Sequence, residues 1–159
     1  MLALLATGCT AGRASADELE RLVEVLELQP GSTVADVGAG DGDWAVNLAE
    51  FVGDSGHVWA TEVEQDDVED IEGRIPAAYA DIITVVLGDQ SGTGLPENCC
   101  DAILLRMVYH HFTKPAEMRA SLRRALRPDG LIAVVDITPQ NSWRDLPEVP
   151  DRGGHGIPH

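Results

Sequence analysis

The stretch VADVGAGDGDW, Val34 to Trp44, decides the fold because an apolar run leads straight into three alternating glycines. Gly38 and Gly40 allow the backbone to turn tightly and a ligand to approach it closely, since glycine carries no Cβ. Gly42 allows a following helix to begin close to the preceding strand. The pattern therefore predicts a turn from a buried strand into a helix, with a ligand lying against the turn.

Strands and helices alternate on both sides of this turn. Apolar runs predict strands over residues 33–38, 57–63, 81–89 and 131–138 and over part of 99–112. Helical spacing predicts helices over residues 15–28, 43–52, 64–75 and 115–126, and the letters RPDG at 127–130 predict a turn. Near-continuous apolar strands are buried on both faces, as in a parallel sheet covered by helices. We therefore predict an α/β fold, a doubly wound Rossmann-like sheet with helices on both faces and a ligand site at the carboxyl ends of the strands.

The chain divides into three parts. Residues 15–138 form the predicted domain, residues 1–14 an apolar or flexible tail, and residues 139–159 an irregular tail rich in proline and glycine. The N-terminal letters MLALLATGC resemble the end of a bacterial lipoprotein leader with Cys9 as the anchor, although no basic region precedes them. We expect a cytoplasmic protein, with the cell envelope as the alternative if this segment is a leader. No apolar run is long enough to span a bilayer.

The composition restricts the partners. The 159 residues carry a net charge of -16, and a surface this acidic repels phosphate backbones, so we expect no nucleic-acid partner. Cys9, Cys99 and Cys100 show no spacing typical of a zinc site, and we expect no metal. Adjacent cysteines rarely bond to each other, so Cys99 and Cys100 are interpreted as small apolar residues that enter a strand.

Three acids near the glycines indicate the charge of the ligand. The nicotinamide fingerprint G-x-G-x-x-G ends in glycine or alanine, whereas here that place holds Asp43. Asp41 and Asp43 lie where a pyrophosphate would meet the N-terminus of the helix, which disfavours an anion there. Asp36, at the end of the strand, also suits a cation. The acids therefore favour a cationic ligand, and a nicotinamide oxidoreductase is a disfavoured alternative.

These motifs resemble those of class I S-adenosylmethionine-dependent methyltransferases. ADVGAGDG is similar to the first motif of that family, an acid followed by GxGxG, and VWATEVE to its second strand, which ends in an acid at Glu62. The third-strand motif of the family is similar to VLGDQ, which contains Asp89. The fourth strand resembles CCDAILLRMVYHHF, and the turn and fifth strand resemble LRPDGLIAVVDI. The match covers about residues 17–138. The resemblance implies S-adenosylmethionine as the cofactor and methyl transfer to a small-molecule acceptor.

The resemblance also assigns cofactor contacts to residues near the strand ends, which are Asp36, Gly38, Ala39, Gly40, Glu62, Asp89, Gln90 and the backbone near Arg106. Glu62 would accept hydrogen bonds from both ribose hydroxyls, and Asp89 from the adenine amino group, with Gln90 lining the ring. Asp36 would hold the methionine end, directly or through water. A simpler role stays open for two of them, because Asp36 or Asp89 could instead cap a helix or a turn.

Two histidines follow the fourth predicted strand. His110 and His111 would therefore lie at the mouth of the site, where a neutral imidazole suits proton removal near neutral pH. They are the candidate catalytic residues, although methyl transfer needs no general base if the acceptor is already nucleophilic. In the alternative interpretation, one histidine packs and the other caps the following turn. Tyr109 could equally line the acceptor pocket.

The last part of the chain departs from the family pattern. The family fold continues after the fifth strand with a helix and an antiparallel hairpin, whereas residues 139–159 show no strand-like alternation. We therefore expect a chain without the hairpin. The alternative to an enzyme is a non-catalytic S-adenosylmethionine-binding remnant that needs a partner or the missing C-terminal part. Without the hairpin, the strand Leu131 to Ile137 would lie at an edge of the sheet, where it could pair with a second copy.

Overall fold

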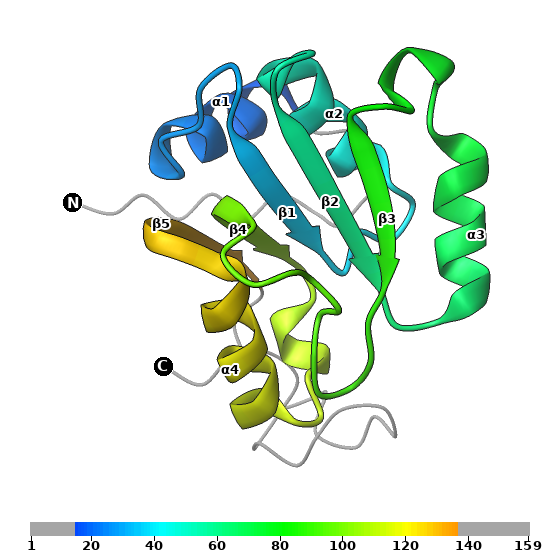
Figure 1. The fold of residues 1–159 in the computed structure, drawn as a ribbon, viewed down its shortest axis with the longest axis vertical. Coiled ribbons are helices and arrows are strands. Elements are labelled where there is room, and N and C mark those ends of the chain that lie inside the picture. Colours follow the sequence, from blue (N-terminus) through cyan, green and yellow to red (C-terminus); the bar gives the residue numbers. More distant parts are fainter. Residues whose placement is uncertain (1–14, 137–159) are drawn as a thin grey trace.

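The computed structural model describes residues 15–136, and in this range five strands form one parallel sheet (Figure 1). The strands are β1 (Thr33–Val37), β2 (His57–Glu62), β3 (Ile83–Leu87), β4 (Cys100–Arg106) and β5 (Leu126–Val135). Their order across the sheet is β3-β2-β1-β4-β5, so the chain starts at the centre, runs to one edge and then crosses to the other. Every pairing is parallel, which confirms the predicted doubly wound sheet.

Helices connect these strands. They are α1 (Ala16–Val25), α2 (Asp43–Val52), α3 (Gln65–Arg74), α4 (Pro115–Ala125) and the short 3-10 helices η1 (Ala77–Tyr79) and η2 (Tyr109–His111). Local sequence explains two of their starts. The hydroxyl of Ser15 accepts a hydrogen bond at 3.2 Å from the backbone N of Glu18, and Pro115 occupies the first turn of α4. Within residues 15–136, no helix is both long and apolar enough to cross a membrane.

The sheet has a hydrophobic core on each face because successive strand residues point to opposite sides. Val34 in β1 and Ala102 in β4 belong to the core that packs α1, α2 and α3. Their neighbours Ala35 and Ile103 belong to the core that packs α4. Helices therefore cover both faces of the sheet, as predicted.

Some predictions lie outside the described residues. These are the leader-like segment with Cys9, the two tails at residues 1–14 and 139–159, and the last two residues of the predicted strand 131–138. They stay predictions.

The start of β5 differs from the sequence-based expectation. The letters RPDG predict a turn at 127–130 with the strand only after it, whereas β5 begins at Leu126. Its pairing with β4 jumps from Leu126 opposite Cys100 to Leu131 opposite Ala102. The residues of the predicted turn therefore form a bulge inside the strand, since proline cannot donate a hydrogen bond to the ladder.

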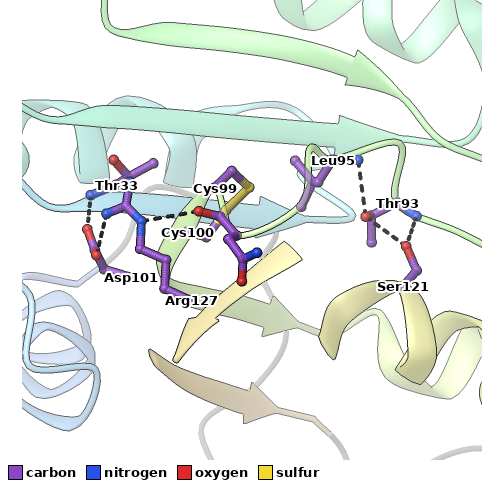
Figure 2. The surroundings of a disulfide bond; sticks show 9 residues. Thr33, Thr93, Leu95, Cys99, Cys100, Asp101, Ser121 and Arg127 are labelled. Carbon is purple, nitrogen blue, oxygen red and sulfur yellow. Dashed lines mark hydrogen bonds and ion pairs between the residues drawn. A yellow bond between two sulfur atoms is a disulfide. The ribbon is translucent and has the colours of Figure 1, made fainter. Parts of the chain in front are cut away.

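The two adjacent cysteines form a disulfide (Figure 2), so the prediction that they do not bond to each other is wrong. Cys100 is the first residue of β4 and is fully buried, as expected for a small apolar residue that enters a strand. Cys99 precedes the strand and follows Asn98, whose φ of 51° is left-handed. Because Cys99 is not yet part of the ladder, the alternation that separates neighbouring side chains in a strand does not hold the two sulfur atoms apart.

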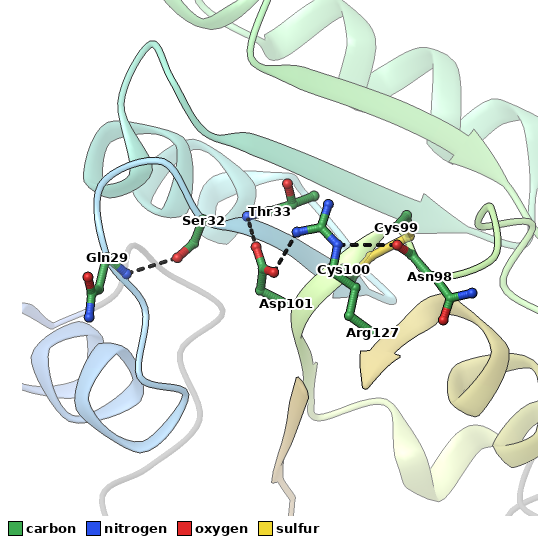
Figure 3. Close-up of polar contacts among 8 residues, drawn as sticks. All are labelled: Gln29, Ser32, Thr33, Asn98, Cys99, Cys100, Asp101 and Arg127. Carbon is green, nitrogen blue, oxygen red and sulfur yellow. Dashed lines mark hydrogen bonds and ion pairs between the residues drawn. A yellow bond between two sulfur atoms is a disulfide. The ribbon is translucent and has the colours of Figure 1, made fainter. Parts of the chain in front are cut away.

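A polar cluster holds the amino end of β4 (Figure 3). Asp101 Oδ2 accepts a hydrogen bond at 2.7 Å from the backbone N of Thr33 in β1. Asp101 Oδ1 lies 2.5 Å from Arg127 Nη1, and Arg127 Nε donates to the carbonyl oxygen of Asn98 at 3.2 Å. One arginine in the bulge therefore joins β5 both to β4 and to the turn that precedes β4.

Candidate functional site

The glycine loop after β1 adopts the tight turn that its sequence predicts. Gly38, Gly40 and Gly42 have left-handed φ values of 74°, 59° and 80°. A Cβ on Gly38 would lie 2.3 Å from the side chain of Val108, so only glycine lets the segment after β4 pack against the loop. A Cβ on Gly40 would meet no atom within 4 Å from the described residues other than its two chain neighbours. The space beside Gly40 is therefore open to a ligand.

Two pockets adjoin this loop at the carboxyl ends of the strands. The larger, of about 640 Å³, is lined by Val37, Gly38, Gly40, Thr61, Glu62, Val63, Glu64, Asp67, Gly88, Asp89, Gln90, Gly92, Thr93, Met107, Val108, His111, Phe112 and Met118. The smaller, of about 310 Å³, is lined by Asp36, Gly38, Ala39, Gly40, Asp41, Asp43, Trp44, Arg106 and Met107. Gly38, Gly40 and Met107 line both pockets, so one elongated ligand that follows the loop can reach into both.

Asp36 in β1 is a buried carboxyl group that lines the smaller pocket. It is 2% exposed, and its Oδ2 has no hydrogen-bond partner among the described residues. Burial raises the pKa of Asp36 from 3.8 to about 7; the nearby Glu62 and Asp41 add to the rise, and Arg106 opposes it. Because an unpaired buried charge is costly, this carboxyl group is suited to a positively charged partner.

Glu62, the last residue of β2, contacts the glycine loop. Its Oε1 accepts a hydrogen bond from the backbone N of Gly40 at 2.7 Å, and its Oε2 accepts one from the backbone N of Val63 at 3.2 Å. Parallel pairing explains this approach, because β1 and β2 are neighbours and their carboxyl ends lie at the same edge of the sheet. The structure thus brings Glu62 and the loop together beside the larger pocket.

Asp89 and Gln90 follow β3 and both line the larger pocket. Asp89 Oδ1 accepts hydrogen bonds from the hydroxyl and the backbone N of Ser91, each at 2.6 Å, and these bonds lower the pKa of Asp89. Asp89 therefore caps a turn, as the simpler interpretation held, and borders the pocket as well. Gln90 Oε1 accepts a hydrogen bond from the hydroxyl of Thr113.

A buried hydrogen bond holds the segment after β3 against α4, and a second bond lies within that segment (Figure 2). The backbone N of Thr93 donates to Ser121 Oγ at 3.0 Å, and the backbone N of Leu95 donates to Thr93 Oγ1 at 3.3 Å. Thr93 and the α4 residue Met118 both line the larger pocket. This side of the pocket is therefore fixed by contacts between a loop and a helix.

Arg106, the last residue of β4, lines the smaller pocket, and its side chain makes contacts that the sequence did not predict. Arg106 Nε lies 3.0 Å from Glu18 Oε1, and Nη2 lies 3.5 Å from Glu18 Oε2. The guanidinium also lies over the ring of Trp44, 4.9 Å from the ring centroid. Because Glu18 belongs to the first turn of α1, this helix contacts a residue that lines the site.

The structure separates the two candidate catalytic histidines. His111 lines the larger pocket. His110 is only 3% exposed; its Nδ1 lies 2.6 Å from Asp136 Oδ1, and its backbone N donates to Asp136 Oδ2 at 3.1 Å. His110 therefore packs, as the alternative interpretation held for one of the two. Tyr109 is not among the described residues that line either pocket, and its hydroxyl accepts a hydrogen bond from Arg119 Nη1 at 3.2 Å.

Sequence reasoning missed Glu18, Trp44 and Met107 as residues of this site. Met107 lines both pockets with a left-handed φ of 57°, which is uncommon for a residue other than glycine. No local signal marks Met107, or Glu18, whose partner Arg106 lies 88 residues away. Trp44 is the second residue of the helix that follows the glycine loop, and that position is a usable signal. Within residues 15–136, no group of His, Cys, Asp and Glu side chains is arranged to hold a metal ion.

Comparisons with known proteins agree with this geometry. Residues 35–134 match the sequence profile of a family described as "Methyltransferase domain". A demethylmenaquinone methyltransferase of Listeria monocytogenes is 25% identical over 128 residues, which cover 78% of this chain and 53% of that protein. A ubiquinone/menaquinone biosynthesis C-methyltransferase of Cupriavidus taiwanensis is 27% identical over 125 residues, with coverage of 78% and 50%. The chain thus spans about half the length of the curated relatives it matches.

A solved structure shares the fold. The crystal structure of a SAM dependent methyltransferase from Aquifex aeolicus has a TM-score of 0.71 with this chain and is 25% identical to it. The match covers 86% of this chain and 71% of the other. The likeness therefore extends over most of the chain.

Proposed function

The chain belongs to the methyltransferase domain family, and from this premise we propose that it transfers a methyl group from S-adenosylmethionine to a small-molecule acceptor. S-adenosylmethionine is the cofactor that this membership implies. The observation that carries the proposal is the buried carboxyl group of Asp36, whose Oδ2 has no partner in residues 15–136, beside the open loop at Gly40. Such an acidic site favours a cationic nucleoside over an anionic dinucleotide.

The residues at the site fit this cofactor. Asp36 would receive the amino group of the methionine end, because its Oδ2 has no partner among the described residues. Glu62 would accept hydrogen bonds from the ribose hydroxyls, and the open space beside Gly40 leaves room for the sugar. Asp89 and Gln90 would contact the adenine ring, since both line the larger pocket. Each role matches the hydrogen-bonding capacity of the side chain.

The chemistry leaves two tasks to the chain's own residues. The cofactor, when bound, supplies a methyl group on a sulfonium that is already activated for displacement. The protein has to position the acceptor and exclude water. We propose that His111, and not His110, takes the proton from an acceptor whose nucleophilic atom carries one. This choice follows from burial, because His111 lines the larger pocket and His110 is enclosed beside Asp136.

The wall of the larger pocket supports an apolar acceptor. Val108, Phe112 and Met118 line it beside His111, and its lining in the described part of the chain includes no Lys or Arg. An acceptor that carries phosphate, or a nucleic-acid backbone, would therefore find no cationic partner there. Two relatives bear the names of methyltransferases of menaquinone and ubiquinone biosynthesis. We therefore propose a small, apolar, ring-shaped acceptor of the quinol type.

Calorimetric titration with S-adenosylmethionine, S-adenosylhomocysteine and NAD tests the cofactor. We expect the first two to bind and NAD not to bind, and a preference for NAD would contradict the proposal. Turnover is then measured as methyl transfer to a small reduced quinone. The variant His111→Ala should lower turnover at unchanged cofactor affinity, because His111 would act only on the acceptor. Binding without turnover in the wild type would favour the non-catalytic alternative.

The edge of the sheet supports a separate proposal about partners. β5 is an edge strand of the described sheet, and its Ile132 and Val134 side chains are 41% and 46% exposed. We propose that β5 pairs with a second copy of the chain, opposed by the net charge of -16. Association in light scattering should therefore increase with protein concentration and with salt, which screens the charge. A monomer at every condition, with slow amide exchange along β5, would contradict this proposal.

A further inference from the structure

The smaller pocket carries charges of both signs. Three aspartates, Asp36, Asp41 and Asp43, and one arginine, Arg106, line this pocket. Because the chain has a net charge of -16, its overall composition does not explain an arginine beside three aspartates. A zwitterion, with an ammonium and a carboxylate close together, matches such a pocket because each group finds an opposite charge.

Two contacts hold Arg106 in one orientation. Glu18 accepts from its Nε at 3.0 Å and from its Nη2 at 3.5 Å, and Trp44 lies against the plane of the guanidinium. A guanidinium has five N–H donors in a rigid plane, and Glu18 takes the edge that contains Nε. Within residues 15–136, no hydrogen bond is seen from the Nη1 group of Arg106. The opposite edge of the guanidinium therefore keeps its donors for another acceptor.

We propose that Glu18 is a positioning residue, which sets Arg106 to bind the carboxylate of the cofactor's amino-acid end. The inference rests on the proposed function and adds α1 to the cofactor site. The side chains of Arg106 and Glu18 are 24% and 34% exposed, so the pair is sheltered enough to keep its geometry. Arg106 would then form a charge-assisted bond with the carboxylate while Asp36 takes the ammonium group.

Two ligands that differ in the amino-acid end test this inference. S-adenosylhomocysteine has that end, whereas 5′-methylthioadenosine keeps the adenosine and the thioether without it. Arg106→Met should weaken S-adenosylhomocysteine binding by about tenfold or more and leave the methylthioadenosine affinity unchanged. Glu18→Gln should weaken S-adenosylhomocysteine binding by about threefold, again without effect on methylthioadenosine, because the arginine stays but loses its fixed orientation.

A matched control separates this role from a general effect of charge. Glu20→Gln removes the same charge from an exposed position on the same helix and should change neither affinity. Thermal unfolding of each variant shows whether the fold is retained. Equal loss of both ligands in Glu18→Gln would show a merely structural role and overturn the inference. Tighter binding of S-adenosylhomocysteine by Glu18→Gln would also overturn it, because Glu18 would then compete with the ligand.

Failure of the proposed function gives a different result. Wild-type protein that binds neither ligand would overturn the proposed function and this inference together. Wild-type protein that binds both ligands, with no change in Glu18→Gln, would overturn this inference alone.

Discussion

Two aspartates on neighbouring strands show how differently the two ends of the sheet are built. Asp101 lies at the amino end of β4, where one oxygen accepts from the backbone N of Thr33 and the other pairs with Arg127 (Figure 3). Asp36 lies toward the carboxyl end of β1, where it is 2% exposed and its Oδ2 has no partner among the described residues. The fold supplies a partner for each oxygen of Asp101, whereas it supplies none for Asp36 Oδ2 among the described residues.

The difference shows that Asp36, and not Asp101, lowers the stability of the folded chain. Asp101 is 40% exposed and lies beside the guanidinium of Arg127. Asp36 is buried among carboxyl groups, so its pKa rises to about 7, and the folded chain carries a group that favours being neutral. A fold under selection for stability alone would not keep such a group, whereas a site for a cationic ligand requires one.

The largest expected effect is on the pH dependence of stability. The folded pKa of Asp36, about 7, lies above its ordinary value of 3.8, so the native state binds the extra proton between these values. Stability should therefore fall as the pH rises from about 4 to about 7, by on the order of 4 kcal/mol from this group. Asp36→Asn should remove that slope in chemical unfolding at a series of pH values. Identical slopes in the variant and the wild type would show that Asp36 is not buried as described.

The next effect is on cofactor affinity. Asp36→Asn should weaken S-adenosylmethionine binding by about 3 kcal/mol, because the ligand's ammonium group would lose its buried ionic partner. Titration calorimetry at pH 8, where Asp36 is mostly charged, measures the difference. The same variant should be more stable than the wild type at that pH. A variant that binds S-adenosylmethionine as tightly as the wild type would show that Asp36 is not the partner of the ammonium group.

A smaller loss of affinity is expected at the end of β2. Glu62→Ala should weaken S-adenosylmethionine binding by about 1.5–3 kcal/mol, because the hydrogen bonds from the ribose to a charged group are lost. Glu64→Ala is the matched control, since Glu64 lines the same pocket two residues later. Calorimetry on folded variants gives the comparison, and equal affinities for Glu62→Ala and the wild type would refute the assignment of Glu62.

The smallest effect is expected at the opposite end of the sheet. Asp101→Asn should lower the free energy of unfolding by about 1 kcal/mol, because the pair with Arg127 is partly exposed to solvent. Cofactor affinity should stay unchanged, since Asp101 lies at the end of β4 that is remote from both pockets. Chemical unfolding and calorimetry on the same sample measure both. A loss of affinity here would mean that the two ends of the sheet are coupled.

The sheet and the loop could be predicted because their signals are local. The strands follow from apolar runs, and the glycine turn follows from three alternating glycines. Glu62 and Asp89 could be placed near each other because neighbouring parallel strands end at one edge of the sheet. These features need only short windows of sequence and the geometry of parallel pairing.

Other features depend on distant partners and could not be predicted. The orientation of Arg106 at the end of β4 depends on Glu18 in α1, and the burial of His110 depends on Asp136 after β5. Proline and glycine together usually indicate a turn that ends a strand. In β5 the same residues form a bulge, and the strand continues after it. The disulfide between Cys99 and Cys100 depends on the residue at which β4 begins, and the apolar pattern does not indicate that residue.

The central position of β1 in the sheet affects when a newly made chain completes its fold. β1 pairs with β2, which follows it closely, and with β4, which the ribosome makes much later, so that Val34 lies beside both Val58 and Ala102. Val108, which follows β4, packs against Gly38, so the loop has all its packing contacts only once β4 has joined the sheet. Ligand binding would then act on the completed fold alone and stabilise it by mass action. We expect the cellular supply of cofactor to influence how long a newly made chain escapes proteolysis.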